Sequence, residues 1–305
     1  MTRSTKLKWL GGLLLTLALS IGIGFWVRPL SFYQGFSELH MWREGAQSNF
    51  TSVGGIRVHY YVMGPTTGPS VVLVHGLGGR SENWQDLAPM LAKAGFRVYL
   101  PDLPGFGLSE RPTGFSYSVP DQAAIVVDFL DASGLTQVDL GGWSMGGWIV
   151  QRVAYDHPER VRRLMLFDSA GINEKPAWNT ALFVPTTAAD VTELDVLLMP
   201  HPPVVPDFVA RDILRSTQRN GWVVRRALDS MLQGHDTTDD LLPRLKMPVL
   251  IVWGSEDHIT PLHQGKRMHQ LVPQSRLDVI QGCGHLAPGQ CAPQIGPKVV
   301  EFLKE

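Results

Sequence analysis

The amino-acid sequence predicts an α/β fold: a mainly parallel sheet with helices on both faces, an inserted helical lid, and one transmembrane helix in front. Three observations lead to this prediction. Short apolar runs alternate with helix-like stretches, residues 172–241 show helical patches without a clear buried strand, and residues 9–27 carry no charge. We therefore divide the chain into an anchor (1–28), a juxtamembrane segment (29–50), a core in two parts (51–171 and 242–305) and the lid (172–241).

The composition narrows the class of protein. The 305 residues include 27 Lys and Arg against 28 Asp and Glu, so a nucleic-acid partner is not expected. With 44% hydrophobic and 18% charged residues, the chain can form a sizeable core. The histidines and the two cysteines show no metal-ligand spacing, and no cofactor or metal is expected.

The uncharged segment Trp9 to Val27 has nineteen residues. As a helix it spans about 28 Å, close to the hydrocarbon core of a bilayer. Basic residues are more frequent before the segment than after it, which predicts a cytoplasmic N-terminus and a body outside the membrane; those before it are Arg3, Lys6 and Lys8. A cleaved signal peptide ending at Ala18-Leu19-Ser20 is the alternative, and it also exports the body.

The next segment, Leu30 to Trp42, is rich in aromatic residues. It suits either a helix in the membrane interface or a linker packed on the body. Small residues in the apolar segment, among them Gly22 and Gly24, also suit pairing of two chains, so a homodimer is an open expectation.

The body begins with residues that alternate in polarity from Ile56 to Val62, as in a half-exposed strand. Continuous apolar runs, typical of buried parallel strands, follow at 71–74, 97–100, 137–140, 163–167 and 248–253. Helix-like stretches lie at 81–94, 121–132 and 145–157. Seventy residues without a strand are too many for a loop, which is why 172–241 is interpreted as a lid.

The sharpest chemical signal is the run Gly142-Trp143-Ser144-Met145-Gly146 between a strand and a helix. This setting is typical of a nucleophile elbow, where a sharp turn exposes the serine hydroxyl. The Gly-rich turn His75 to Gly79 follows another strand. We assign the two N–H groups of an oxyanion hole to Leu77 and Met145.

Two further residues can form a catalytic triad with Ser144. Asp257 and His285 each follow a predicted strand, and the order Ser144, Asp257, His285 is that of one class of hydrolase. An imidazole removes the proton of the serine hydroxyl, and the carboxylate orients the imidazole. Asp168, which also follows a strand, is the less favoured candidate for the acid.

These motifs resemble those of the α/β-hydrolase family. The resemblance covers residues 51–303 and rests on HGLGG, DLPGFGLS, GWSMGG, WGSEDHITP and GCGHLAP. With the anchor, the chain resembles the single-pass membrane lipases, monoacylglycerol lipases and phospholipases A of that family. The resemblance implies a serine carboxylic-ester hydrolase, with catalytic residues Ser144, Asp257 and His285.

A membrane anchor favours lipid acyl esters as substrates, either monoacylglycerol or glycerophospholipid. Apolar lid residues such as Phe183 and Trp222 are expected to pack on the body or to line an acyl pocket. The alternatives within the family are hydrolysis of carbon–carbon bonds in ring-cleavage products and perhydrolysis. If the protein is not an enzyme, the alternative is a catalytically silent binding or scaffold protein with the same fold. Cys283 and Cys291 flank the histidine, either as a disulfide or as free thiols.

Overall fold

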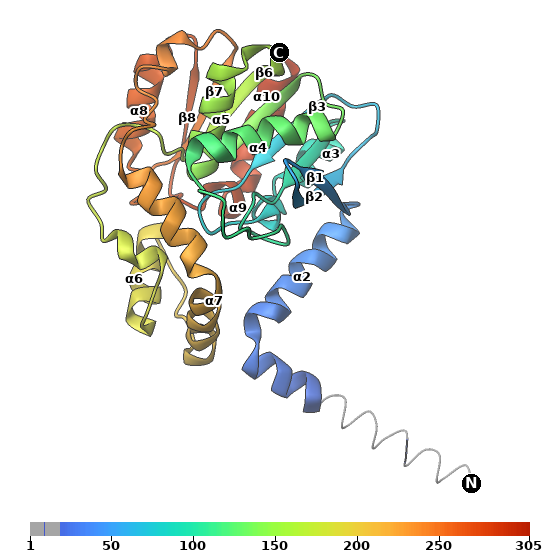
Figure 1. Cartoon of the computed structure of the whole chain (residues 1–305), viewed down its shortest axis with the longest axis vertical. Helices are drawn as coiled ribbons and strands as arrows, with labels where there is room; N and C mark the ends of the chain where they lie inside the picture. Colours follow the sequence, from blue (N-terminus) through green and yellow to red (C-terminus); the bar gives the residue numbers. More distant parts are fainter. Residues whose placement is uncertain (1–8, 10–18) are drawn as a thin grey trace.

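The computed structural model describes residue 9 and residues 19–305 (Figure 1). Its centre is one eight-stranded sheet with the order β1-β2-β4-β3-β5-β6-β7-β8. The first two pairings, β1 with β2 and β2 with β4, are antiparallel, and all the others are parallel. The strands are β1 (Gln47–Val53), β2 (Ile56–Met63), β3 (Ser70–Val74), β4 (Arg97–Pro101), β5 (Val138–Trp143), β6 (Val161–Phe167), β7 (Val249–Gly254) and β8 (Arg276–Ile280).

Helices cover both faces of the sheet because the central strands are apolar on both sides. In β3, Val72 and Val74 belong to one buried cluster, and Val71 and Leu73 belong to the other. The first cluster includes side chains of α4 (Val119–Ala132), α5 (Met145–Asp156) and α8 (Leu262–Leu271). The second includes side chains of α2 (Pro29–Arg43), α3 (Ala88–Lys93), α9 (Ala287–Gln290) and α10 (Ala292–Lys304).

The predicted strands are all present, and two expectations differ in detail. The sheet begins at Gln47, inside the segment expected to be juxtamembrane. Strand β1 was not predicted because its sequence is too polar to show a strand pattern. The stretch 81–94, expected to be one helix, is a 3₁₀ turn at Ser81–Trp84 followed by α3, which begins at Ala88 just before Pro89. Proline suits the first turn of a helix, so α3 starts there rather than earlier.

The inserted segment, residues 172–241, lies between β6 and β7. It contains α6 (Ala188–Leu198) and α7 (Asp207–Leu232), and it contacts the core near the carboxyl ends of the strands. Figure 1 shows α6 and α7 on the same side of the molecule as residues 19–43.

Residues 1–8 and 10–18 of the predicted anchor (1–28) lie outside the described residues. Residues 19–27 are helical and lead into α2. Among residue 9 and residues 19–305, no helix is both long enough and apolar enough to cross a bilayer. The transmembrane anchor therefore stays a prediction.

Candidate active site

Ser144 occupies a strained turn between β5 and α5. Its backbone has φ 55° and ψ −119°, a conformation that residues other than glycine rarely adopt. The turn fits only because its neighbours are small: a Cβ atom on Gly146 would lie 2.3 Å from the main-chain oxygen of Val74. A buried parallel strand, a sharp turn and a helix thus present the hydroxyl at the carboxyl edge of the sheet.

The structure brings the three predicted residues together. His285 Nε2 lies 2.9 Å from Ser144 Oγ, and His285 Nδ1 lies 2.8 Å from Asp257 Oδ2. All three residues are buried, with exposed fractions of 7% or less. Asp257 also accepts the N–H groups of Ile259 and Thr260 at Oδ1, at 2.8 and 2.9 Å. These bonds hold the carboxylate so that Oδ2 faces the imidazole.

Thr260 is a member of the site that the sequence analysis missed. Its hydroxyl lies 2.8 Å from Asp257 Oδ2, 3.2 Å from His285 Nδ1 and 3.0 Å from the main-chain oxygen of Asp168. The sequence signal that could have indicated Thr260 is the aspartate three residues before it, because an aspartate in a turn often accepts the N–H groups two and three residues later. This hydroxyl helps to fix the carboxylate against the histidine.

Asp168 does not contact the histidine in the way that Asp257 does. Its Oδ1 accepts the N–H of Gly254 at 2.7 Å, while its Oδ2 is buried without a partner among the described residues. Burial raises the pKa of the Asp168 carboxyl well above its ordinary value, and the charge of Asp257 raises it further. These effects favour the neutral form of Asp168, which lies beside the site.

The two expected N–H donors both lie close to Ser144. Met145 is the first residue of α5, and the first N–H groups of a helix have no partner inside it. Leu77 lines the cavity into which Ser144 opens, and a Cβ atom on neighbouring Gly76 would lie 3.1 Å from Ser144 Cβ. The Gly-rich turn thus passes directly beside the serine, as an oxyanion hole requires.

His75 holds that turn in place. It is fully buried, and burial lowers the pKa of its imidazole, which favours the neutral form. Nε2 accepts the N–H of Leu103 at 3.0 Å, and the proton on Nδ1 is donated to the main-chain oxygen of Gly76 at 2.8 Å. His75 is thus a structural part of the loop.

The cavity at Ser144 has a volume of about 280 Å³ and is lined mainly by apolar side chains. The inserted segment supplies several of these, including Phe183. From the core, Trp148 lines the cavity, whereas Trp143 lies beneath His285 and donates its indole N–H to the His285 main-chain oxygen at 2.7 Å. The cavity therefore offers an apolar surface beside the serine.

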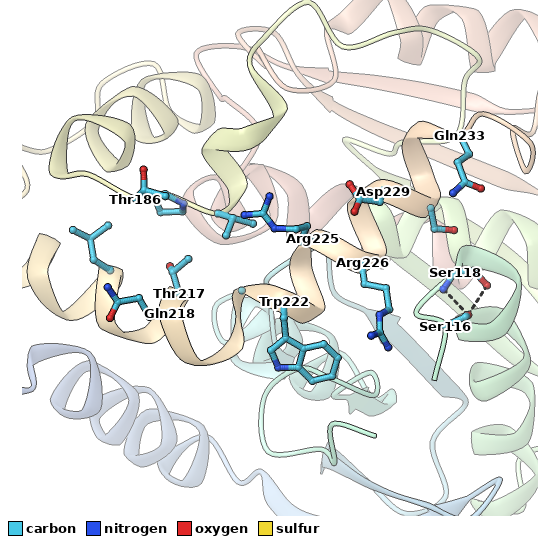
Figure 2. A pocket seen from close by; sticks show the side chains of 15 residues that line it. Ser116, Ser118, Thr186, Thr217, Gln218, Trp222, Arg225, Arg226, Asp229 and Gln233 are labelled. Atoms are coloured by element: carbon cyan, nitrogen blue, oxygen red, sulfur yellow. Dashed lines mark hydrogen bonds between the residues drawn. The ribbon is translucent and has the colours of Figure 1, made fainter. Parts of the chain in front are cut away.

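A larger groove of about 770 Å³ runs along α7 and has a more polar lining. Figure 2 shows Trp222, Arg225 and Asp229 on α7, with Ser116 and Ser118 on another wall. Ser144 does not line this groove, although Gln233 lines both spaces. Trp222, a possible pocket residue, thus faces the groove and not the cavity at Ser144.

The disulfide is present. Cys283 and Cys291 are bonded across eight residues and enclose His285 in a small loop. Among the described residues, no cluster of histidine, cysteine and acidic side chains has the arrangement of a metal site.

The fold and this geometry define a hydrolase of the α/β class. A family model described as "alpha/beta hydrolase fold" matches residues 69–189 and 207–289, which is more than half of the chain. The chain belongs to the α/β-hydrolase family and is a serine hydrolase.

Three named proteins show how the chain relates to known enzymes. Lipase 1 of Psychrobacter immobilis is 27% identical over 249 residues, which are 78% of each chain. A 2-hydroxy-6-oxo-2,4-heptadienoate hydrolase of Pseudomonas putida is 32% identical and is matched over 87% of its length and 76% of this chain. The crystal structure of a membrane phospholipase A superposes with a TM-score of 0.82 at 27% identity, covering 97% of this chain and 98% of that one.

Proposed function

We propose that the protein is a serine carboxylic-ester hydrolase that acts on acyl esters of lipids, either monoacylglycerol or glycerophospholipid, at a membrane. The observation that carries this proposal is the hydrogen-bonded chain Ser144–His285–Asp257, which ends at a cavity lined mainly by apolar side chains. Similarity to a lipase and to a membrane phospholipase A supports the lipid substrate.

In the proposed reaction, Ser144 Oγ attacks the ester carbonyl while His285 Nε2 accepts its proton. Asp257 and the Thr260 hydroxyl hold the imidazole in the required orientation. The N–H groups of Leu77 and Met145 stabilise the oxyanion. The alcohol leaves with the proton from His285, and the same imidazole then activates the water that releases the acyl group.

The proposal includes attachment to the membrane by residues 9–27, with the N-terminus in the cytoplasm and the catalytic body outside. The Cys283–Cys291 disulfide supports this location, because such bonds persist in oxidising compartments. Pairing of two chains through the apolar segment is part of the same proposal.

The test compares the full-length protein in detergent with its Ser144→Ala variant. Fatty-acid release from a monoacylglycerol and from a diacyl phospholipid is measured in one buffer. We expect Ser144→Ala to lower release by at least about 10³-fold, because no other group replaces the nucleophile. An exposed serine on β1 provides the control, and Ser52→Ala should keep full activity. Normal release by folded Ser144→Ala would disprove the assignment.

A carbon–carbon bond hydrolase of ring-cleavage products is the second candidate. The 32% identical relative carries such a name, and Lys175 lines the Ser144 cavity, where a cation suits a carboxylated substrate. Ser144-dependent cleavage of a 2-hydroxy-6-oxo-dienoate, without release of fatty acid from either lipid, would favour this candidate.

A further inference from the structure

The tip of the inserted segment is an apolar surface of its own. From Val196 to Pro206 the chain reads VLLMPHPPVVP, without a lysine, arginine, aspartate or glutamate. Val204 is 94% exposed and Val196 is 50% exposed. The stretch contains four prolines, and Leu198 and Pro200 lie against the loop of His285. Val196 and Val204 are its exposed large apolar side chains.

This tip lies beside the N-terminal helices. Phe208, in the first turn of α7, contacts Trp26 with ring centroids 4.3 Å apart and Phe25 with centroids 5.7 Å apart. The Arg215 guanidinium donates to the main-chain oxygen of Val27. Phe208 follows the tip by two residues, so these contacts place the end of the tip next to the helix at residues 19–27. We call the exposed apolar residues of the tip and of the N-terminal helices the docking surface.

A buried acid fixes this arrangement. Asp212 on α7 is only 3% exposed, and its Oδ2 accepts the N–H of Leu30 at 3.1 Å, in the first turn of α2. Its Oδ1 lies 3.1 Å from Arg215 and 3.6 Å from Arg28. A carboxylate at the N-terminus of a helix and between two guanidinium groups is well compensated, so it can hold α7 against the N-terminal helices.

The exposed residues of the N-terminal helices suit a lipid surface. Trp26, Tyr33, Phe36 and Trp42 are each 62–70% exposed. Tryptophan and tyrosine prefer the boundary between head groups and acyl chains. Figure 1 shows α6, the start of α7 and residues 19–43 on one side of the molecule, away from the C-terminus.

We propose that Val204 and the rest of the tip of the inserted segment dock onto the lipid bilayer together with residues 28–42, at the point where the proposed anchor leaves the membrane. This inference rests on the proposed function and extends it. The inserted segment borders the cavity at Ser144 through Leu228 and Met231 at the other end of α7. Docking thus holds the cavity-forming helix on the membrane, where acyl esters are drawn from the bilayer.

A fluorescent probe tests the docking directly. Both cysteines of the chain are in the disulfide, so Val204→Cys introduces the single reactive thiol for an environment-sensitive dye. The matched control is Ala132→Cys, an exposed position at the end of α4, before β5 and thus at the opposite edge of the sheet. The full-length labelled proteins are reconstituted in vesicles of phosphatidylethanolamine and phosphatidylglycerol, with and without spin-labelled lipid.

We expect a blue-shifted emission and quenching by spin-labelled lipid at position 204, and neither at position 132. Equal, water-like emission at both positions would overturn the proposal. A blue shift at position 204 that appears in detergent without lipid and rises with protein concentration would also overturn it, since that result assigns the surface to a second copy of the chain.

Activity measurements separate this inference from the proposed function. Val204→Asp should lower hydrolysis of vesicle phospholipid by at least about tenfold, because an ionised side chain resists entry into the apolar layer. Hydrolysis of a short-chain soluble ester should stay unchanged. Unchanged hydrolysis of vesicle phospholipid by Val204→Asp would contradict docking without affecting the role of Ser144. Normal hydrolysis of the soluble ester by Ser144→Ala would instead contradict the proposed function itself.

Discussion

The carboxyl of Asp168 is fully buried, and its Oδ2 has no hydrogen-bond partner among the described residues, which favours the neutral form. Burial and the nearby Asp257 charge raise its pKa above the ordinary value of 3.8. The folded state therefore keeps this proton at a pH where the unfolded chain has lost it. Stability must fall as pH rises from about 4 towards the raised pKa, because the unfolded state binds fewer protons there.

Asp168→Asn should remove this dependence. The amide keeps an oxygen for the N–H of Gly254 and never ionises, so the free energy of unfolding should decline less between pH 4 and pH 7 than in the wild type. Urea unfolding at several pH values measures this difference. An unchanged slope of stability against pH would show that Asp168 is ionised in the folded protein.

At the level of strands and helices, much of the architecture follows from local pattern. The central strands are buried on both faces, so each appears in the sequence as a continuous apolar run, and β5 with α5 also carries the turn at Ser144. Strand β1 has no such pattern because its polar side chains face solvent at the edge of the sheet. The positions of Ser144, Asp257 and His285 followed from strand ends, whereas the hydroxyl of Thr260 depends on a turn that no periodicity reveals.

The disulfide loop makes a separate prediction. Removing both thiols by Cys283→Ser and Cys291→Ser should lower the free energy of unfolding by about 2.5 kcal/mol, the value expected from chain entropy for a loop of this size. Urea unfolding of the double variant, with the reduced wild type for comparison, checks the value. A loss below about 0.5 kcal/mol would show that the loop is held by packing alone, through contacts such as that of Trp143 with His285.

For the molecule as a whole, the sequence does not reveal how distant segments meet. Asp212 lies 182 residues after Leu30, and neither position carries a motif. Contacts of this kind depend on the fold of the entire chain. For the same reason, the sequence position of Trp222 does not show whether its side chain lines the groove along α7 or the cavity at Ser144.

The Asp212 contact should control the attachment of the N-terminal helices. Asp212→Ala removes the acceptor for Leu30 and the partner of Arg28, so chymotrypsin should cleave after the neighbouring Trp26 several-fold faster than in the wild type. The time course of cleavage of the full-length protein measures this effect. Asp207→Ala, which removes an exposed carboxylate from the same helix, is the control and should not accelerate cleavage. Equal rates in the two variants would contradict a holding role for Asp212.

The position of β8 has a consequence for how the enzyme loses activity. Within the part of the chain that the structure describes, this strand lies at the edge of the sheet and pairs only with β7. It leads directly into the loop of His285. Ser144, by contrast, follows a central strand with neighbours on both sides. Edge elements open locally at lower free energy than the centre of a sheet. Fraying of this one edge withdraws the base from the nucleophile while the rest of the molecule remains native, so catalytic competence is a more fragile property than the fold that carries it.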